Sequence, residues 1–217
     1  MRVNEKLKVK ERATILVAAR LLSDVFRPSY YPLMGFAILL MFTYLSQLPW
    51  AFKVGLLIIV YLFTHFIPMV GVYAFRQSRS HTRRQILVRH NRIVPYLLHF
   101  VSYVMLYHML SSIQSPSFVK AIVVISLLVQ ICCIIITLFW NISMHSAGAG
   151  AIIGALVVYA SLFHFNPVWW LCAAILVSGL VNSSRMLLRQ HTLWQVLGGT
   201  LVGFLCGYVG IFVESII

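Results

Sequence analysis

Histidine and arginine are the residues of this sequence that are best suited to chemistry on a phosphate group. His145 lies at the start of one long apolar run, and Arg185 and His191 flank a short basic stretch before another. An imidazole with a pKa near neutral can attack phosphorus or protonate a leaving oxygen. Guanidinium groups hold phosphate oxygens through forked, charge-assisted hydrogen bonds. Two histidines and several arginines around one pocket would suffice for phosphoryl transfer without a metal ion.

The carboxylates of the chain disfavour several other kinds of enzyme. They are Glu5, Glu11, Asp24 and Glu214, and the first three belong to the N-terminal segment while Glu214 ends the last apolar run. We therefore expect neither a carboxylate acid/base pair nor an oxygen shell for Mg²⁺ or Ca²⁺. Glycosidase-like and two-metal mechanisms are poor fits, and we expect no metal or other cofactor. The sequence fits a transporter less well than a phosphate-handling enzyme, because no apolar run carries a carboxylate in its interior.

The composition is typical of a membrane protein. Of the residues, 61% are hydrophobic and 10% are charged, and the apolar residues form long runs. The formal net charge of +13 comes from cations that mostly flank these runs and are not interleaved with aromatic residues. We therefore expect a membrane surface or an anionic lipid headgroup as partner, and no nucleic acid.

The elements that must position these residues are predicted to be all α-helical. We expect a polytopic transmembrane helix bundle of six to seven spans in residues 31–217. A basic N-terminal segment, residues 1–30, is expected to hold an interfacial helix, and Arg27-Pro28 then leads the chain into the bilayer. The predicted spans are residues 32–48, 54–75, 93–110, 121–140, 146–163, 168–182 and 194–213.

Alternating spans bring the candidate residues to one face. The connections 76–92, 141–145 and 183–191 must share that face with the N-terminus. Of the 17 lysines and arginines, all except Lys53 and Lys120 fall there. The positive-inside rule favours a cytoplasmic location for this face, although cations that bind substrate are not topology signals. We expect a multi-pass protein of a cell membrane, the bacterial inner membrane, with the sidedness of the active face left open.

Small residues recur every four positions in two of the predicted spans. Gly150 and Gly154 do so in the fifth, and Gly199, Gly203 and Gly207 do so in the last. This spacing lets helix backbones approach closely in lipid. We interpret it as packing inside the bundle, with a homodimer seam as the alternative.

Two segments resemble motifs of the type-2 phosphatidic acid phosphatase family, which includes bacterial lipid phosphatases and vanadium haloperoxidases. The family's motifs are K-x6-R-P, P-S-G-H and S-R-x5-H-x3-D. Ser184, Arg185 and His191 fit S-R-x5-H of the third motif, and Ser143 and His145 keep the serine and histidine of the second. The order and the one-sided placement of the motifs strengthen the resemblance.

The first motif has a weaker counterpart in this interpretation. Arg89 and Arg92 precede Pro95 without being adjacent to it, and the motif's lysine has no clear equivalent. The resemblance runs from Arg84 to Gly203.

The resemblance implies roles for the matching residues. His191 would be the nucleophile that forms a phosphohistidine, and His145 would protonate the leaving alcohol. The implied phosphate ligands are Arg185, Arg92, Arg89, Ser143 and Ser184, helped by backbone N–H groups at a helix N-terminus.

Three positions depart from the family pattern. Gln195 stands where the family has the aspartate that orients the nucleophilic histidine. Its amide oxygen can accept the Nδ1–H bond, but it cannot stabilise an imidazolium as a carboxylate does. Met144 replaces the glycine and Ile142 the proline of the second motif. Slower turnover or loss of activity could follow.

The leading hypothesis is therefore a metal-independent phosphatase of a phosphorylated or pyrophosphorylated membrane lipid. One alternative is a lipid phosphotransferase, in which another alcohol resolves the phosphohistidine on His191. The other is a lipid-binding membrane protein that has lost the chemistry, for which Gln195 is the best argument.

Overall fold

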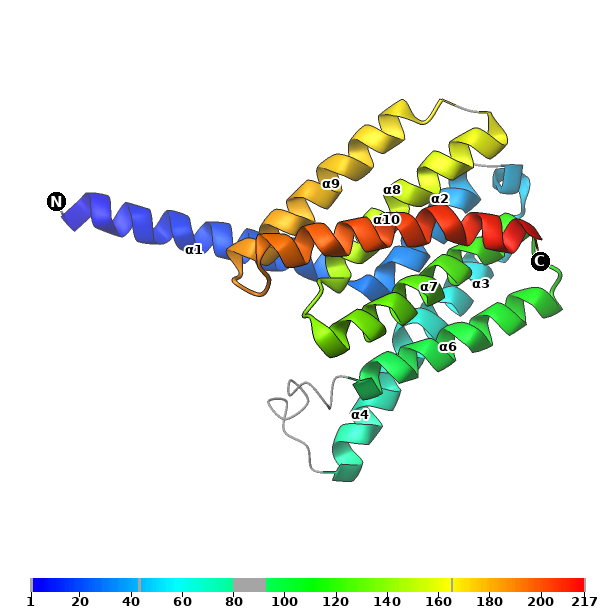
Figure 1. Cartoon of the computed structure of the whole chain (residues 1–217), viewed down its shortest axis with the longest axis horizontal. Helices are drawn as coiled ribbons and strands as arrows, with labels where there is room; N and C mark the ends of the chain where they lie inside the picture. Colours follow the sequence, from blue (N-terminus) through cyan, green and yellow to red (C-terminus); the bar gives the residue numbers. More distant parts are fainter. Residues whose placement is uncertain (1, 43, 80–92, 165, 217) are drawn as a thin grey trace.

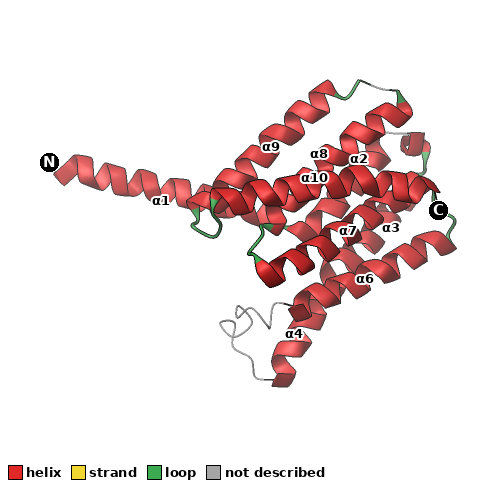
Figure 2. Ribbon diagram, viewed as in Figure 1, coloured by secondary structure: helices red, strands yellow, loops and turns green. Residues whose placement is uncertain are grey.

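The helical content of the chain follows from its long apolar runs. In lipid a helix satisfies every backbone N–H and C=O within its own segment. The structure is a computed structural model that describes residues 2–42, 44–79, 93–164 and 166–216. Within these ranges the chain forms helices joined by short connections, and no strand occurs (Figure 2). The predicted all-α membrane bundle is confirmed.

Among the described residues, five helical segments are long and apolar enough to cross a membrane. The first is the run Trp50–Phe75, built from α3 (Trp50–Tyr61), a π-helical turn (Leu62–Phe66) and most of α4 (Ile67–Arg79). The others are α7 (Ser117–Phe139), α8 (Met144–Phe163), α9 (Val168–Leu187) and α10 (Leu193–Ile216). The shorter α2 (Tyr31–Phe42), which follows a 3-10 turn at Pro28–Tyr30, and α6 (Ile93–Ser112) complete the bundle. Each predicted span overlaps one of these segments, but the first, predicted over residues 32–48, ends as an α-helix at Phe42 and a 3-10 turn follows at Tyr44–Gln47.

Helix α9 is longer than the sequence predicted. A loop was expected from residue 183, but the helix continues to Leu187. The reason is that its polar side chains find partners inside the bundle. Asn182 donates from Nδ2 to the hydroxyl of Thr200 at 3.1 Å, and the hydroxyl of Ser184 donates to the Val181 carbonyl at 2.7 Å. Arg185 is therefore fixed on the last turn of a helix and does not lie in a loop.

The connections gather at two ends of the bundle (Figure 1). The α7–α8 and α9–α10 connections lie at the end where α1 (Arg2–Val25) joins the bundle, whereas the α8–α9 connection and the C-terminus lie at the other. At this second end Nζ of Lys120 lies 2.8 Å from Oε1 of the buried Glu214, and the Tyr107 hydroxyl donates to Oε2 at 3.1 Å. The ion pair ties α7 to α10 away from the candidate site.

Helices α8 and α10 pack backbone against backbone. A Cβ atom at Gly150 would collide with the carbonyl oxygen of Thr200, and one at Gly203 with that of Ala147. Glycines of the two helices thus face each other's carbonyls along the whole contact, which supports the interpretation as packing inside the bundle. The close approach aligns the first turns of α8 and α10, on which His145 and Gln195 lie.

Helix α1 projects beyond one end of the bundle (Figure 1), and its C-terminal part contacts α9. Through this contact the last turns of α1 lie at the end of the bundle where His145 and Arg185 are found. The interfacial location of the helix, and the division into residues 1–30 and 31–217, stay predictions.

Candidate active site

A polar pocket of about 350 Å³ opens at the end of the bundle where α1 joins it. Its walls come from α1, the Pro28–Tyr30 turn, α6, α7, the start of α8 and the end of α9. We call it the polar pocket. Its ionisable side chains are the following: Arg20, Asp24, Arg27, Tyr96, His99, Tyr103, His145 and Arg185.

His145 reaches the polar pocket from the first turn of α8. The hydroxyl of Ser143 caps this helix and accepts hydrogen bonds from the Ser146 backbone N–H at 3.4 Å and hydroxyl at 2.8 Å. The Tyr31 hydroxyl donates to the His145 carbonyl at 3.0 Å. Because both ends of the first turn are held, the backbone that carries the imidazole is fixed.

Charged or titratable side chains from other parts of the chain act electrostatically on the His145 imidazole. Arg185, His191 and Arg27 lie close enough for their charges to act on it. They come from α9, from the α9–α10 connection and from the turn after α1, respectively. The two histidines predicted from the sequence thus lie at the same end of the bundle, but of the two only His145 lines the polar pocket.

Gln195 fixes the tautomer of His191. Its side-chain oxygen Oε1 accepts a hydrogen bond from the Thr192 backbone N–H at 3.1 Å, which identifies that atom as the amide oxygen. The same oxygen lies 3.2 Å from Nδ1 of His191. An oxygen can only accept, so Nδ1 must carry the proton and the lone pair is left on Nε2. A nucleophilic imidazole requires this arrangement.

Arg185 retains unused hydrogen-bonding capacity. Its Nη1 donates to the hydroxyl of Ser23 on α1 at 2.7 Å. Its Nε is buried and has no hydrogen-bond partner among the described residues. A buried, unpartnered guanidinium N–H is costly unless an acceptor completes it, and a bound anion would be such an acceptor.

Arg20 and Arg27 are two cationic wall residues that sequence reasoning missed. They come from the last turns of α1 and the turn that follows. The sequence does contain a motif that could have identified them, because Arg20-x6-Arg27-Pro28 matches K-x6-R-P with arginine in place of lysine. The sequence interpretation placed this motif in the segment from Arg89 to Pro95, whereas Arg20 and Arg27 precede His145 by more than a hundred positions.

Asp24 also lines the polar pocket, although no carboxylate was expected there. Its Oδ1 accepts hydrogen bonds from Arg27, at 2.7 Å from Nη2 and 3.3 Å from Nε. These hydrogen bonds, and the charge of the same guanidinium, hold the pKa of the Asp24 carboxyl below its usual value. The pair keeps Arg27 partly neutralised while no anion is bound.

The remaining predicted ligands do not line the polar pocket. Ser143 is fully buried as the cap of α8, and Ser184 is buried with its hydroxyl bonded to Val181. Arg89 and Arg92 lie outside the described residues. Phosphate binding by these four residues stays a prediction.

The described part of the chain holds no group of three or more His, Cys, Asp and Glu side chains suited to binding a metal ion. What the polar pocket does offer is imidazole and guanidinium. This combination can bind a phosphate group, attack it and protonate a leaving oxygen.

The fold and the polar pocket define a polytopic helical membrane protein with a basic, histidine-containing site at one end of its bundle. Residues 137–213 match the PAP2 superfamily, which is consistent with a type-2 phosphatidic acid phosphatase-like family. The matched stretch includes His145, Arg185, His191 and Gln195. No curated protein and no solved structure matches the chain. The superfamily match supports a phosphatase-type hydrolase activity on phosphorylated substrates in a membrane protein.

Proposed function

We propose that the protein is a metal-independent phosphatase of a phosphorylated or pyrophosphorylated membrane lipid, acting through a phosphohistidine on His191. The observation that carries the proposal is the convergence of His145, Arg185 and Arg27 on one pocket, with His191 as the electrostatic neighbour of His145. The unpartnered Nε of Arg185 supports an anionic ligand.

An apolar cavity next to the polar pocket supports a lipid as the substrate. A cavity of about 540 Å³, lined mainly by apolar side chains of α2, α7 and α8, lies beside it. Four residues line both spaces: Pro28, Tyr103, Gln130 and Met144. A molecule with a phosphate at one end and a hydrocarbon body would match both environments.

In the first half-reaction Nε2 of His191 attacks phosphorus and the bond between phosphorus and the lipid oxygen breaks. His145 donates a proton to the departing oxygen, so that the lipid leaves as an alcohol, or as a monophosphate if the substrate was a diphosphate. Arg185 and Arg27, with Arg20, stabilise the charge that develops on the phosphoryl oxygens. Gln195 holds the Nδ1 proton of His191 throughout.

In the second half-reaction a water molecule gives a proton to His145 and its oxygen attacks phosphorus. The bond between phosphorus and Nε2 breaks, which releases inorganic phosphate and restores His191. The same imidazole thus acts first as an acid and then as a base.

Release of inorganic phosphate by the detergent-purified protein tests the proposal. The substrates are a long-chain lipid phosphomonoester, a lipid diphosphate and glycerol phosphate as a chain-free comparison. We expect release from a lipid substrate, and a loss of at least about a thousandfold in His191→Ala.

The matched control is His108→Ala, because His108 is exposed near the opposite end of α6. It should retain full activity. Equal release from His191→Ala and the unmodified protein would end the proposal.

A further inference from the structure

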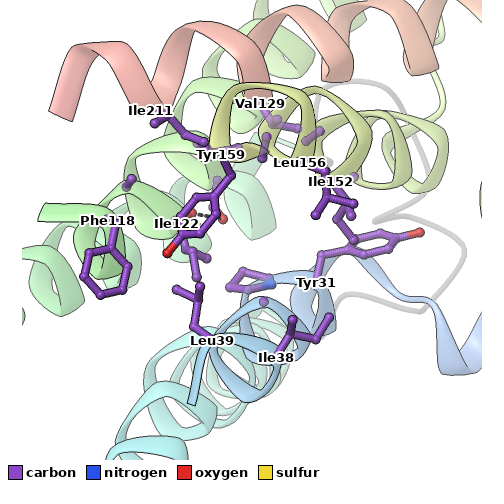
Figure 3. Close-up of a pocket in the computed structure, with 18 of the residues that line it drawn as sticks. Tyr31, Ile38, Leu39, Phe118, Ile122, Val129, Ile152, Leu156, Tyr159 and Ile211 are labelled. Carbon is purple, nitrogen blue, oxygen red and sulfur yellow. Dashed lines mark hydrogen bonds between the residues drawn. The ribbon is translucent and has the colours of Figure 1, made fainter. Parts of the chain in front are cut away.

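The apolar cavity is a feature that the chemistry of the polar pocket does not use. It occupies about 540 Å³ between α2, α7 and α8, with Ile211 of α10 at one side (Figure 3). The wall from α8 follows one face of that helix, where small residues such as Ala151 and Ala155 leave the space open. Cavities of roughly 300–1,000 Å³ are typical of ligand sites.

Tyr31 stands where the apolar cavity meets the polar pocket. Its ring lines the cavity and packs on Gly148, where any Cβ would collide with it. Its hydroxyl bonds the carbonyl of His145, whose side chain lines the polar pocket. Met144, next to His145, lines both spaces. A chain attached to a phosphate in the polar pocket would therefore enter the apolar cavity directly.

Three aromatic side chains lie at the opposite end of the apolar cavity. Tyr159 and Phe163 stack with ring centroids 4.4 Å apart, and Phe118 packs edge-on against them at 6.2 and 6.0 Å. Figure 3 shows Phe118 and Tyr31 at the two extremes of the cavity, with Ile122 and Leu39 between them. We call Phe118, Tyr159 and Phe163 the aromatic end cluster.

The length of the apolar cavity follows from the helix that lines it. Met144 and Tyr159 both face the cavity, and at a rise of about 1.5 Å per residue they are separated by about 22 Å. One leaflet of a bilayer contributes roughly 15 Å of hydrocarbon, half of the ~30 Å core. An extended chain longer than the thickness of one leaflet can thus lie along this wall before it meets the aromatic end cluster.

We infer that the apolar cavity binds a hydrocarbon chain of the phosphorylated substrate and that the aromatic end cluster sets the longest chain that fits. The inference rests on the proposed function for the phosphate at the head of that chain. Chains that stop before the cluster gain affinity with each added methylene, since each buries more apolar surface. Chains that extend beyond it gain nothing further or are rejected.

Kinetics on a series of n-alkyl monophosphates, from octyl to eicosyl at a fixed detergent ratio, test the inference. For the unmodified protein kcat/KM should rise with chain length and then level off or fall. Tyr159→Ala should move that break to longer chains, with a gain of about tenfold for the longest chain relative to dodecyl phosphate. Tyr73→Ala is the matched control, because Tyr73 is 66% exposed on the outer surface of α4, and it should leave the break in place.

Photocrosslinking gives a readout that requires no turnover and no variant of the cluster. An octadecyl phosphate with a diazirine at its chain terminus is bound to the full-length His191→Ala protein and irradiated. We expect labelling of Phe118, Tyr159 or cavity-facing neighbours such as Leu156.

The outcomes separate the two claims. Labelling confined to outward-facing residues such as Leu176 and Leu180, which are 69% and 57% exposed, would overturn the inference. The inference would also be overturned if phosphate is released but kcat/KM shows no break with chain length, or if folded Tyr159→Ala has its break at the same chain length. Either result would leave the proposed function intact. If the aromatic end cluster is labelled but the unmodified protein releases no phosphate from any substrate, the chain-binding site is retained and the phosphatase proposal is rejected.

Discussion

The side-chain oxygen of Gln195 lies 3.2 Å from Nδ1 of His191 and accepts a hydrogen bond from it. An amide at this position sets the tautomer of the imidazole as a carboxylate would, but it brings no negative charge. In the proposed mechanism Nε2 of His191 would therefore be the nucleophile, and the positive charge that develops on the imidazole would be stabilised less than by a carboxylate.

Replacing that amide by a carboxylate tests this reasoning. Gln195→Asp should raise kcat or leave it unchanged, because a carboxylate stabilises the positive charge that develops on His191. Gln195→Leu should lower kcat by about 10- to 100-fold, as removal of a ligand's orienting partner does elsewhere. Steady-state kinetics on one lipid phosphate compares the two. A large loss in Gln195→Asp would show that the amide has a role of its own.

Arg27 is predicted to hold the phosphate. Arg27→Ala should lower kcat/KM by about a hundredfold, because a preorganised donor to the phosphoryl oxygens is lost. Arg27→Lys should recover only part of the loss, since an ammonium lacks the planar fork. The control is Arg189→Ala, because Arg189 is an exposed arginine of the α9–α10 connection. Equal activity in Arg27→Ala and Arg189→Ala would remove Arg27 from the site.

Asp24 is predicted to compete with phosphate for Arg27. The hydrogen bonds and charge of Arg27 hold the pKa of Asp24 below its usual value. A lowered pKa keeps the carboxylate ionised above that pKa, so the competition persists at neutral pH and ends only as the pH falls through it. At neutral pH Asp24→Asn should therefore tighten competitive inhibition by inorganic phosphate about two- to fivefold. Weaker inhibition would mean that Asp24 helps to position Arg27 for the anion.

The bundle was predictable because its signals are local. Each span is an apolar run of sufficient length, and the alternation of spans placed His145 and Arg185 at one end without tertiary information. The glycine repeat on α10 likewise indicated a close helix contact. The end of α9 was predicted too early because Ser184 is polar and Arg185 is charged, and only the folded structure shows their hydrogen-bond partners.

The contribution of α1 to the site was not predictable in the same way. Nothing local to Ser23 indicates that its hydroxyl receives a hydrogen bond from Arg185. The spacing from Arg20 to Arg27-Pro28 could have identified both arginines, had arginine been allowed at the lysine position of the motif. The apolar cavity could not be predicted from the sequence, because the residues that line it are apolar like those that face lipid.

The contact between α8 and α10 yields a prediction about stability. Gly203→Ala should lower the free energy of unfolding by about 1–3 kcal/mol, because its Cβ would meet the Ala147 carbonyl and force the helices apart. Gly179→Ala is the matched control, since a Cβ there meets nothing within 4 Å, and it should be neutral or slightly stabilising. Thermal unfolding in detergent compares the two proteins. Equal stability would argue against backbone packing at this contact.

The phosphorylated residue itself tests the central claim most directly. The protein is mixed with a lipid substrate carrying a labelled phosphate, quenched in alkali during turnover and mapped by mass spectrometry. The label is expected on His191, at a nitrogen that is stable to alkali and labile to acid, and it should be absent from His191→Ala. Label on His145, or phosphate release during turnover with no labelled histidine at any quench time, would contradict the account.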